Sequence, residues 1–183
     1  MALLAGVAKP MVRLVLTDKW LPCVPYIQIF CFSYAFWPVH TSNLQAINAM
    51  GRSDIFLRLE VYKKVLGWST LAFAVFYFDD PITIAATSIV MTIIGCFINC
   101  HPNKYLLRYS YSEQIKDILP YFSAAIASFL LIVRMDNIFN NNILTIVTQV
   151  IIAVLLYSVM TYVMKCSAWE IILVKFNRYK TGK

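Results

Sequence analysis

Long uncharged apolar runs constrain the fold of this chain more than any other feature of the sequence. Residues 20–50 contain no Lys, Arg, Asp or Glu, and neither do residues 82–100, 118–133 and 137–164. A helix needs about 20 apolar residues to cross roughly 30 Å of hydrocarbon. These runs therefore predict a chain that lies largely within a lipid bilayer.

Two weaker runs extend this pattern. Residues 65–78 are uncharged but short, and we expect their helix to begin further back, near Ile55. Residues 2–16 are also apolar, although a lysine, a proline and an arginine interrupt them. Short polar turns separate neighbouring runs, and short connections make adjacent helices antiparallel. The sequence therefore predicts an all-α integral membrane protein, an up-and-down bundle of five or six transmembrane helices.

Composition agrees with a surface that faces lipid. Of the 183 residues, 60% are hydrophobic and only 14% are charged, whereas soluble domains carry roughly 25% charged residues. The sequence shows none of the alternating ten-residue segments that are typical of a membrane β-barrel. Helices are therefore the expected way of satisfying the backbone within the bilayer.

The positions of the cationic residues predict the topology. Most of the 16 Lys and Arg residues lie around Gly51, within residues 104–116 and in the tail after residue 164. The alternate connections contain only Lys19 and Arg134. Lys and Arg accumulate in cytoplasmic loops, so we expect the first group and the C-terminus to be cytoplasmic. Because the net charge of +7 lies between apolar runs, it indicates membrane lipid, and not nucleic acid, as the partner.

The chain divides into two unequal regions. Residues 1–167 are predicted to form a polytopic membrane domain, and residues 168–183 a basic cytoplasmic tail. The tail combines Trp169 and Phe176 with several cations, a pattern that suits a helix lying on an anionic leaflet. A frayed basic tail is the alternative.

The sequence contains no motif that indicates catalysis. A nucleophile elbow, a P-loop and an H-E-x-x-H pattern are all absent, and there are only two histidines. We therefore expect no enzymatic activity and no cofactor. Cys96, Cys100 and His101 lack a fourth ligand nearby in the sequence, so we expect no metal site either.

One helix face within residues 20–50 carries the side chains that we expect to contact substrate. Five residues recur on this face with helical spacing: Tyr34, Trp37, Thr41, Gln45 and Asn48. Pro38 lies among them and is expected to kink the helix. Aromatic rings stack on sugars and amides bond hydroxyls, so this face suits a water-filled cavity that binds sugar. Hydrogen bonding between packed helices is the alternative.

Three cations are candidate contacts for an anionic group such as a diphosphate. Lys9 and Arg13 share one face of the first run. If that run spans the membrane they point into a cavity, and otherwise they extend to the membrane surface. Arg58 lies near the cytoplasmic start of a helix, where an ordinary juxtamembrane role is the alternative. We expect Glu60 to pair with Lys64 four residues later, and we expect no Asp or Glu deep in any span.

Two segments resemble those of a known family. Residues 19–28 read KWLPCVPYIQ and resemble the K-W-x-P-x-V-P-x-x-Q stretch of bacterial lipopolysaccharide and capsule flippases. Residues 43–54 read NLQAINAMGRSD and resemble their N-x-x-x-x-x-A-x-G-R-x-D segment, which joins two helices on the cytoplasmic side. Those flippases are Wzx-type O-antigen exporters of the multidrug/oligosaccharidyl-lipid/polysaccharide superfamily. The rest of the chain fits them in hydropathy only.

The resemblance implies transport. Such exporters have a multidrug-extrusion-like fold, in which two helical lobes surround a central cavity. They move an undecaprenyl-diphosphate-linked oligosaccharide across the bacterial inner membrane during the synthesis of O-antigen, capsule or exopolysaccharide. The lobes open alternately to the two sides, which is the general logic of transporters. The resemblance assigns no substrate-contacting residue in this chain.

The resemblance covers only the C-terminal lobe of such an exporter. We therefore expect either a fragment or a half that works with a missing N-terminal lobe or with a second copy of itself. The alternative function is a non-transporting membrane scaffold of a glycan-assembly complex. A scaffold would have a dry bundle and an exposed apolar docking face, whereas an exporter would have a cavity between its helices.

The charge pattern yields a test of topology. Reporter domains fused after Gly51 and after Lys183 are expected to lie on the same, cytoplasmic side of the membrane, because both positions adjoin the cation-rich connections. Alkaline phosphatase and green fluorescent protein fusions measure this directly. Opposite sides for the two fusions would contradict the predicted topology.

Overall fold

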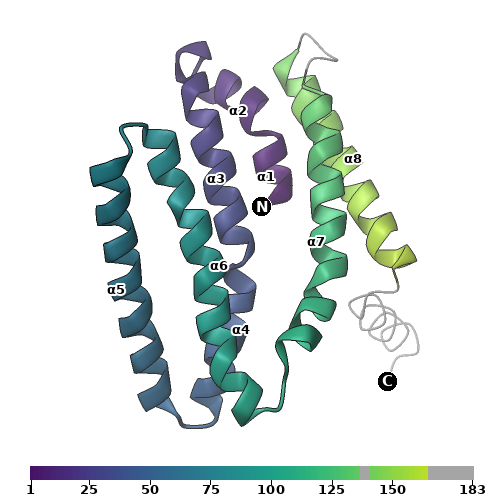
Figure 1. Ribbon diagram of the computed structural model, residues 1–183. Coiled ribbons are helices and arrows are strands. Elements are labelled where there is room, and N and C mark those ends of the chain that lie inside the picture. Colours follow the sequence, from purple (N-terminus) through teal and green to yellow (C-terminus); the bar gives the residue numbers. More distant parts are fainter. Residues whose placement is uncertain (137–140, 165–183) are drawn as a thin grey trace, which may run out of the picture.

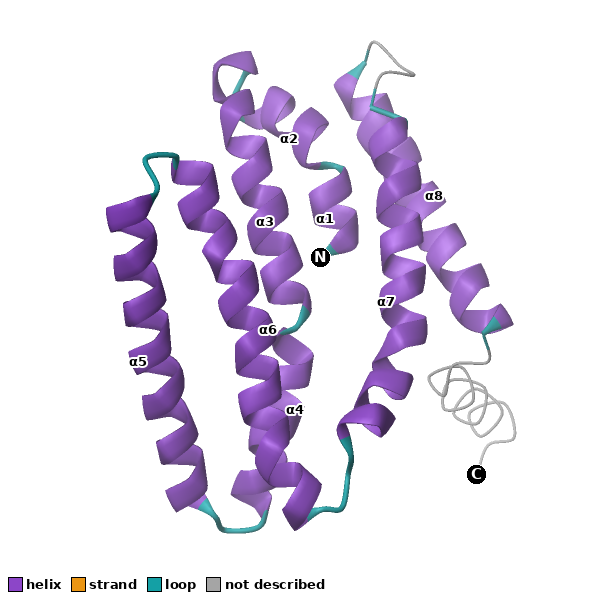
Figure 2. Ribbon diagram, in the orientation of Figure 1, coloured by secondary structure: helices purple, strands orange, loops and turns teal. Residues whose placement is uncertain are grey.

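The computed structural model describes residues 1–136 and 141–164, and every regular element within them is a helix (Figures 1 and 2). The elements in chain order are α1 (Ala2–Gly6), α2 (Ala8–Val15), η1 (Asp18–Cys23), α3 (Val24–Ala35), α4 (Trp37–Ala49), α5 (Ser53–Tyr77), α6 (Pro81–Leu106), α7 (Tyr111–Arg134) and α8 (Asn142–Val163). The predicted all-α architecture is confirmed for this part of the chain. The predicted tail at 168–183 lies outside the described residues.

Three helices are long and apolar enough to cross a membrane. They are α6, α7 and α8, with 26, 24 and 22 residues. α5 is of similar length, with 25 residues, but its first half carries several charged side chains. The structure thus supports a helical membrane protein, and the five or six spans stay a prediction.

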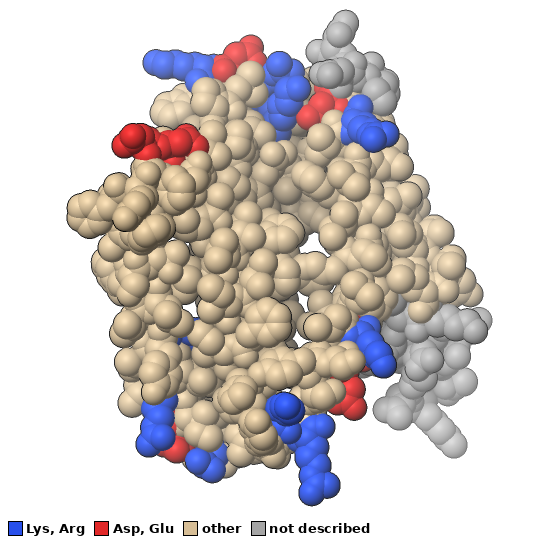
Figure 3. All heavy atoms as spheres, in the orientation of Figure 1, with Lys and Arg blue, Asp and Glu red and all other residues tan. Residues whose placement is uncertain are grey.

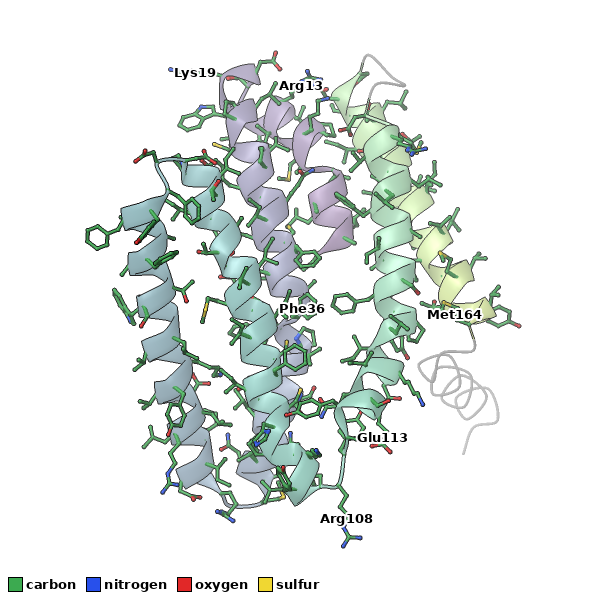
Figure 4. The ribbon with its side chains drawn as sticks, viewed as in Figure 1. Arg13, Lys19, Phe36, Arg108, Glu113 and Met164 are labelled. Atoms are coloured by element: carbon green, nitrogen blue, oxygen red, sulfur yellow. The ribbon has the colours of Figure 1, made fainter. Side chains whose placement is uncertain are left out.

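The longest uncharged run does not form one continuous helix. α3 ends at Ala35 and α4 begins at Trp37, with Pro38 in the first turn of α4. Proline has no N–H to donate to the carbonyl one turn earlier, so the helical ladder is interrupted here, as the sequence predicts. Phe36 marks the break, and Figure 4 places it about midway between the two ends of the bundle.

The first apolar run forms two short helices instead of one span. α1 has five residues and α2 has eight, and Val7 separates them. At about 1.5 Å per residue neither is long enough to cross a bilayer. The interpretation of Lys9 and Arg13 as residues of a complete span is therefore wrong.

The helices form two groups that meet along only part of their length (Figure 1). α6 packs against α3, α4 and α5, and α7 packs against α8. α1 contacts both α3 and α7, and α2 contacts α8. The short N-terminal helices thus join the two groups near one end, while the other end is joined through the loop between α6 and α7. Long helices that follow one another in the chain run antiparallel, as predicted, whereas α6 runs in the same direction as α3 and α4, against which it packs (Figure 1).

Charged side chains gather at the two ends of the bundle and leave an apolar belt between them (Figure 3). Arg13 and Lys19 lie at one end, and Arg108 and Glu113 lie towards the other (Figure 4). The belt exposes large apolar side chains, of which Phe76 at 87% and Trp68 at 72% are examples. Such a surface would be unfavourable in water, whereas in a bilayer it faces hydrocarbon.

Glycines on neighbouring helices provide a matched test of this packing. A Cβ added at Gly95 of α6 would lie 3.0 Å from His40 Cε1, whereas one at Gly67 of α5 would meet only Met91 Cε, at 4.0 Å. We expect Gly95→Ala to lower the free energy of unfolding by about 1 kcal/mol, because overpacking exceeds the gain in helix propensity. Gly67→Ala should be neutral or stabilising by up to about 1 kcal/mol.

Thermal unfolding of the purified variants in detergent measures both changes. If Gly95→Ala were as stable as Gly67→Ala, close packing of α4 on α6 would be contradicted.

Candidate functional site

A groove lies between the two helix groups. It has a volume of about 1210 Å³ and is lined by residues from α1, α3, α4, α7 and α8, with a contribution from α6. Most of its lining side chains are apolar, including Phe32, Phe122 and Phe129. The space-filling view shows the surface hollowed between the two groups (Figure 3). A groove of this size is large enough for a substantial part of a lipid-like ligand.

The predicted polar face divides between the groove and the outer surface. Tyr34 and Trp37 line the groove, with exposed fractions of 53% and 63% and ring centroids 6.2 Å apart. Thr41, Gln45 and Asn48 are exposed further along α4 and are not among the groove-lining residues. The structure therefore brings two of the five residues into a cavity.

Thr41 does not link neighbouring helices in the way that the packing alternative requires. Its hydroxyl donates to the Trp37 carbonyl one turn earlier in α4, at 3.0 Å. This bond lies within a single helix, so it adds nothing to contacts between helices.

The three candidate cations do not line the groove. Lys9 is partly buried on α2, and Arg58 is exposed on α5. Arg13 Nε donates to Asp18 Oδ1 at 3.0 Å in an exposed ion pair near one end of the bundle. Exposed pairs of this kind contribute little to stability. The structure thus gives none of the three a position beside a ligand in the groove.

Glu60 pairs with Lys63, three residues later, and not with Lys64 as expected. The Lys63 side chain is only 18% exposed and that of Glu60 is 32% exposed. Glu60 is the eighth of the 25 residues of α5, and the expectation that no Asp or Glu lies deep in any span stays a prediction.

A buried polar network joins α4, α6 and α7, and the sequence analysis missed it. Asn43 Nδ2 donates to Gln114 Oε1 at 3.1 Å, and the Cys100 thiol donates to the same oxygen at 2.9 Å. Asn103 Nδ2 donates to Asn43 Oδ1 at 2.6 Å and to the Asn43 carbonyl at 3.1 Å. All four residues are at least nine-tenths buried. This network links the N-terminal turns of α7 to the other helix group.

The network continues from Asn103 along α6 to Asn99 and from there to α4. Asn99 Nδ2 lies 2.9 Å from His40 Nδ1, and Cys96 Sγ lies 3.4 Å from His40 Nε2. The ring packs directly on the α6 backbone at Gly95. His40 is thus held on both nitrogens in addition to its packing.

Several polar atoms of this network have no hydrogen-bond partner within the described residues. They are Asn99 Oδ1, Asn103 Oδ1 and Gln114 Nε2. Buried polar atoms are usually paired with protein or ordered water. Unpaired atoms of both donor and acceptor type leave room for a small polar ligand or for a second hydrogen-bonding arrangement.

Asp117 lines the groove on the side of the α6–α7 loop. Its carboxylate accepts a hydrogen bond from the Tyr109 hydroxyl. Burial of the Tyr109 hydroxyl is the main reason that the pKa of Tyr109 is raised to about 12, and the hydrogen bond to Asp117 and the charge of Asp117 raise it further. Tyr109 therefore stays protonated at physiological pH and continues to donate to Asp117.

The described residues contain no group of three or more His, Cys, Asp or Glu that could hold a metal ion. His101, which adjoins the two cysteines in sequence, is exposed and instead forms a hydrogen bond through Nδ1 with the Tyr111 hydroxyl at 2.9 Å.

The sequence did contain a signal for the missed network. Asn99 and Asn103 are one helical turn apart, and Asn43 follows His40 by three residues. Amides and histidine within apolar helices usually bond across helices. The longer polar repeat lies on the other face of α4, and that repeat led to the predicted substrate face. Periodicity alone does not show which face of a helix meets a neighbour.

Comparison with family models, with curated proteins and with solved structures gives no match.

The network yields a test by a double-mutant cycle. Asn43→Ala and Gln114→Ala are each expected to cost about 1–3 kcal/mol, because each leaves a buried partner unpaired. The loss of unfolding free energy in the double variant should differ from the sum of the two single losses by about 0.5–1.5 kcal/mol. Reversible unfolding in mixed micelles measures these values.

The control cycle combines Asn43→Ala with Gln149→Ala, because Gln149 bonds the Ile132 carbonyl and Asp136 elsewhere in the structure. That pair should be additive to within about 0.5 kcal/mol. Equal coupling in the two cycles would argue against a specific contact between α4 and α7.

Proposed function

We propose that this chain is one lobe of a membrane exporter that moves a polyprenyl-diphosphate-linked oligosaccharide across the bacterial inner membrane. The groove between the two helix groups carries this proposal. The resemblance of residues 19–28 and 43–54 to polysaccharide flippases supports the same substrate class. The C-terminus is cytoplasmic in this proposal, and α5 and the α3–α4 pair cross the membrane along with α6, α7 and α8.

The chemistry of the groove suits the lipid part of such a substrate. Its walls are mainly apolar and aromatic, so they bury a polyprenyl chain without leaving polar groups unpaired. Tyr34 and Trp37 lie on the side of α3 and α4, close to the break at Phe36. Their rings can stack on the first sugar while their apolar edges contact the chain.

The arrangement of the helix groups suits a transport cycle. α6 and α7 contact each other only weakly, and the groups are joined chiefly near their ends. Motion of α7 and α8 relative to the other helices would therefore change the width of the groove. Since transporters work by rocking one bundle against another around a central site, a second lobe or a second copy of this chain would complete the cavity.

The groove also favours this function over that of a scaffold. A scaffold is expected to have a dry bundle with an exposed apolar docking face, whereas a groove of about 1210 Å³ between the two helix groups is the feature expected of an exporter.

Binding of a fluorescent short-chain polyprenyl diphosphate that carries one sugar tests the proposal. Trp37→Ala should weaken binding by about fivefold, because the variant loses an aromatic contact in the groove. Fluorescence anisotropy of the purified chain in detergent micelles measures the dissociation constant.

Trp68→Ala is the matched control. Trp68 lies on α5, is 72% exposed and does not line the groove, so its removal should leave binding unchanged. Equal losses in the two variants, or no binding by the unmodified chain, would refute this role of the groove.

A further inference from the structure

Ionisable side chains occur on three helices that pack together away from the groove. His40 on α4 contacts Cys96 on α6, and the partly buried Glu60–Lys63 ion pair lies on the neighbouring α5. At about 1.5 Å per residue, His40, Lys63 and Cys96 each lie about 15 Å from the end of their helix nearest the Gly51 turn. α5 and α6 have 25 and 26 residues and are longer than roughly 30 Å of hydrocarbon, so these residues would lie between its middle and the edge nearest the Gly51 turn. Ionisable residues at such depth usually have a function.

The contacts of the His40 ring define its neutral form. Asn99 Nδ2, an obligatory donor, lies 2.9 Å from Nδ1, so Nδ1 accepts and the proton is on Nε2. Nε2 faces Cys96 Sγ at 3.4 Å, and the Thr92 backbone carbonyl is a further hydrogen-bond partner of the ring. The neutral ring is therefore satisfied on both nitrogens.

The same contacts can accommodate the protonated ring. A second proton, on Nδ1, would require an acceptor in place of the Asn99 amide N–H. Asn99 Oδ1 is buried and has no partner within the described residues, and Asn99 itself is 0% exposed. Rotation of the amide by about 180°, which exchanges its O and N positions, would bring Oδ1 to Nδ1. Asn99 can thus bond His40 in either protonation state.

The ion pair on α5 acts on the charge of the ring. Glu60 and Lys63 pair with each other on α5, which packs against both α4 and α6, the helices that hold His40 and its partners. The Glu60 carboxylate favours an imidazolium, and the Lys63 ammonium opposes it. Together with the Cys96 thiol of α6, these are the titratable groups that face His40 in the part of the chain that the structure describes. A shift of α5 relative to α4 would change the balance between the two charges.

A file of polar side chains leads from His40 towards one end of the bundle. Asn99 and Asn103 are one turn apart on α6, Asn103 bonds Asn43, and Asn43 bonds Gln114 near the start of α7. Unpaired buried atoms occur along this file, and such atoms are where internal water is found. Water bound at these atoms would connect His40 with the aqueous side near the α6–α7 loop.

We propose that His40 is a proton-binding site inside the bundle, that Asn99 bonds it in both protonation states, and that Glu60 and Lys63 set its proton affinity. Binding forms one N–H bond at Nδ1 and leaves a cationic ring between α4 and α6. Any role of this site in driving transport rests on the proposed function, but binding of the proton does not.

Histidine NMR of the purified chain in micelles tests the site, because His40 and His101 are the only histidines and His101→Gln assigns the signals. The Cε1–H signal of His40 should move with pH as the ring gains a proton. Lys63→Met should raise its midpoint and Glu60→Gln should lower it, each by about threefold to tenfold in proton affinity. Asn99→Leu should lower the midpoint, because the bond that it removes from the protonated ring is charge-assisted and stronger than the bond that it removes from the neutral ring.

The His101 signal is the internal control and should be the same in all three variants. Circular dichroism identifies any variant that has not folded, and the others still decide the outcome. A His40 signal that does not change with pH while the chain stays folded, or a midpoint that no folded variant shifts, would show that His40 is only a packing residue. If the unmodified chain did not bind the lipid-linked sugar but its His40 signal still titrated as expected, the proposed function would be refuted and the proton site would not.

Discussion

The structure depends on the fact that hydrocarbon offers no hydrogen bonds. Backbone groups are therefore hydrogen-bonded within helices. Hydrogen bonds between polar side chains inside the bundle stabilise the packing of the helices, because no water competes for the same donors and acceptors. The Asn43–Gln114 bond shows the consequence, since it joins α7 to α4 where apolar contacts between α6 and α7 are few. Apolar packing alone would not choose this arrangement, because lipid contacts the same side chains equally well.

The same constraint explains why the groove and the polar network occupy different places. The groove is walled mainly by apolar and aromatic side chains, and an apolar ligand can replace lipid there at little cost. The network contains amides, a thiol and an imidazole in a closely packed, buried region, away from the groove. The groove is thus suited to a large lipid-like substrate, and the polar network is suited to the gain or loss of a proton at His40.

Close packing makes the two parts interdependent. The His40 ring lies on the α6 backbone at Gly95, so α4 cannot move along α6 without disturbing the ring's hydrogen bonds. Trp37 belongs to the same helix one turn earlier and lines the groove. A change at His40 therefore has a direct mechanical route to the groove wall through α4.

The sequence by itself determined the helical class, the approximate positions of the long apolar helices, the interruption at Pro38 and the collection of charges at the helix ends. These follow from chain-local chemistry, since run length, proline and charge act wherever a helix lies. Only the tertiary structure decided that Tyr34 and Trp37 line a groove, that Asn43 and His40 face α6, and that Glu60 pairs with Lys63. In lipid both faces of a helix can be apolar, so periodicity shows which residues share a face but not which face another helix covers.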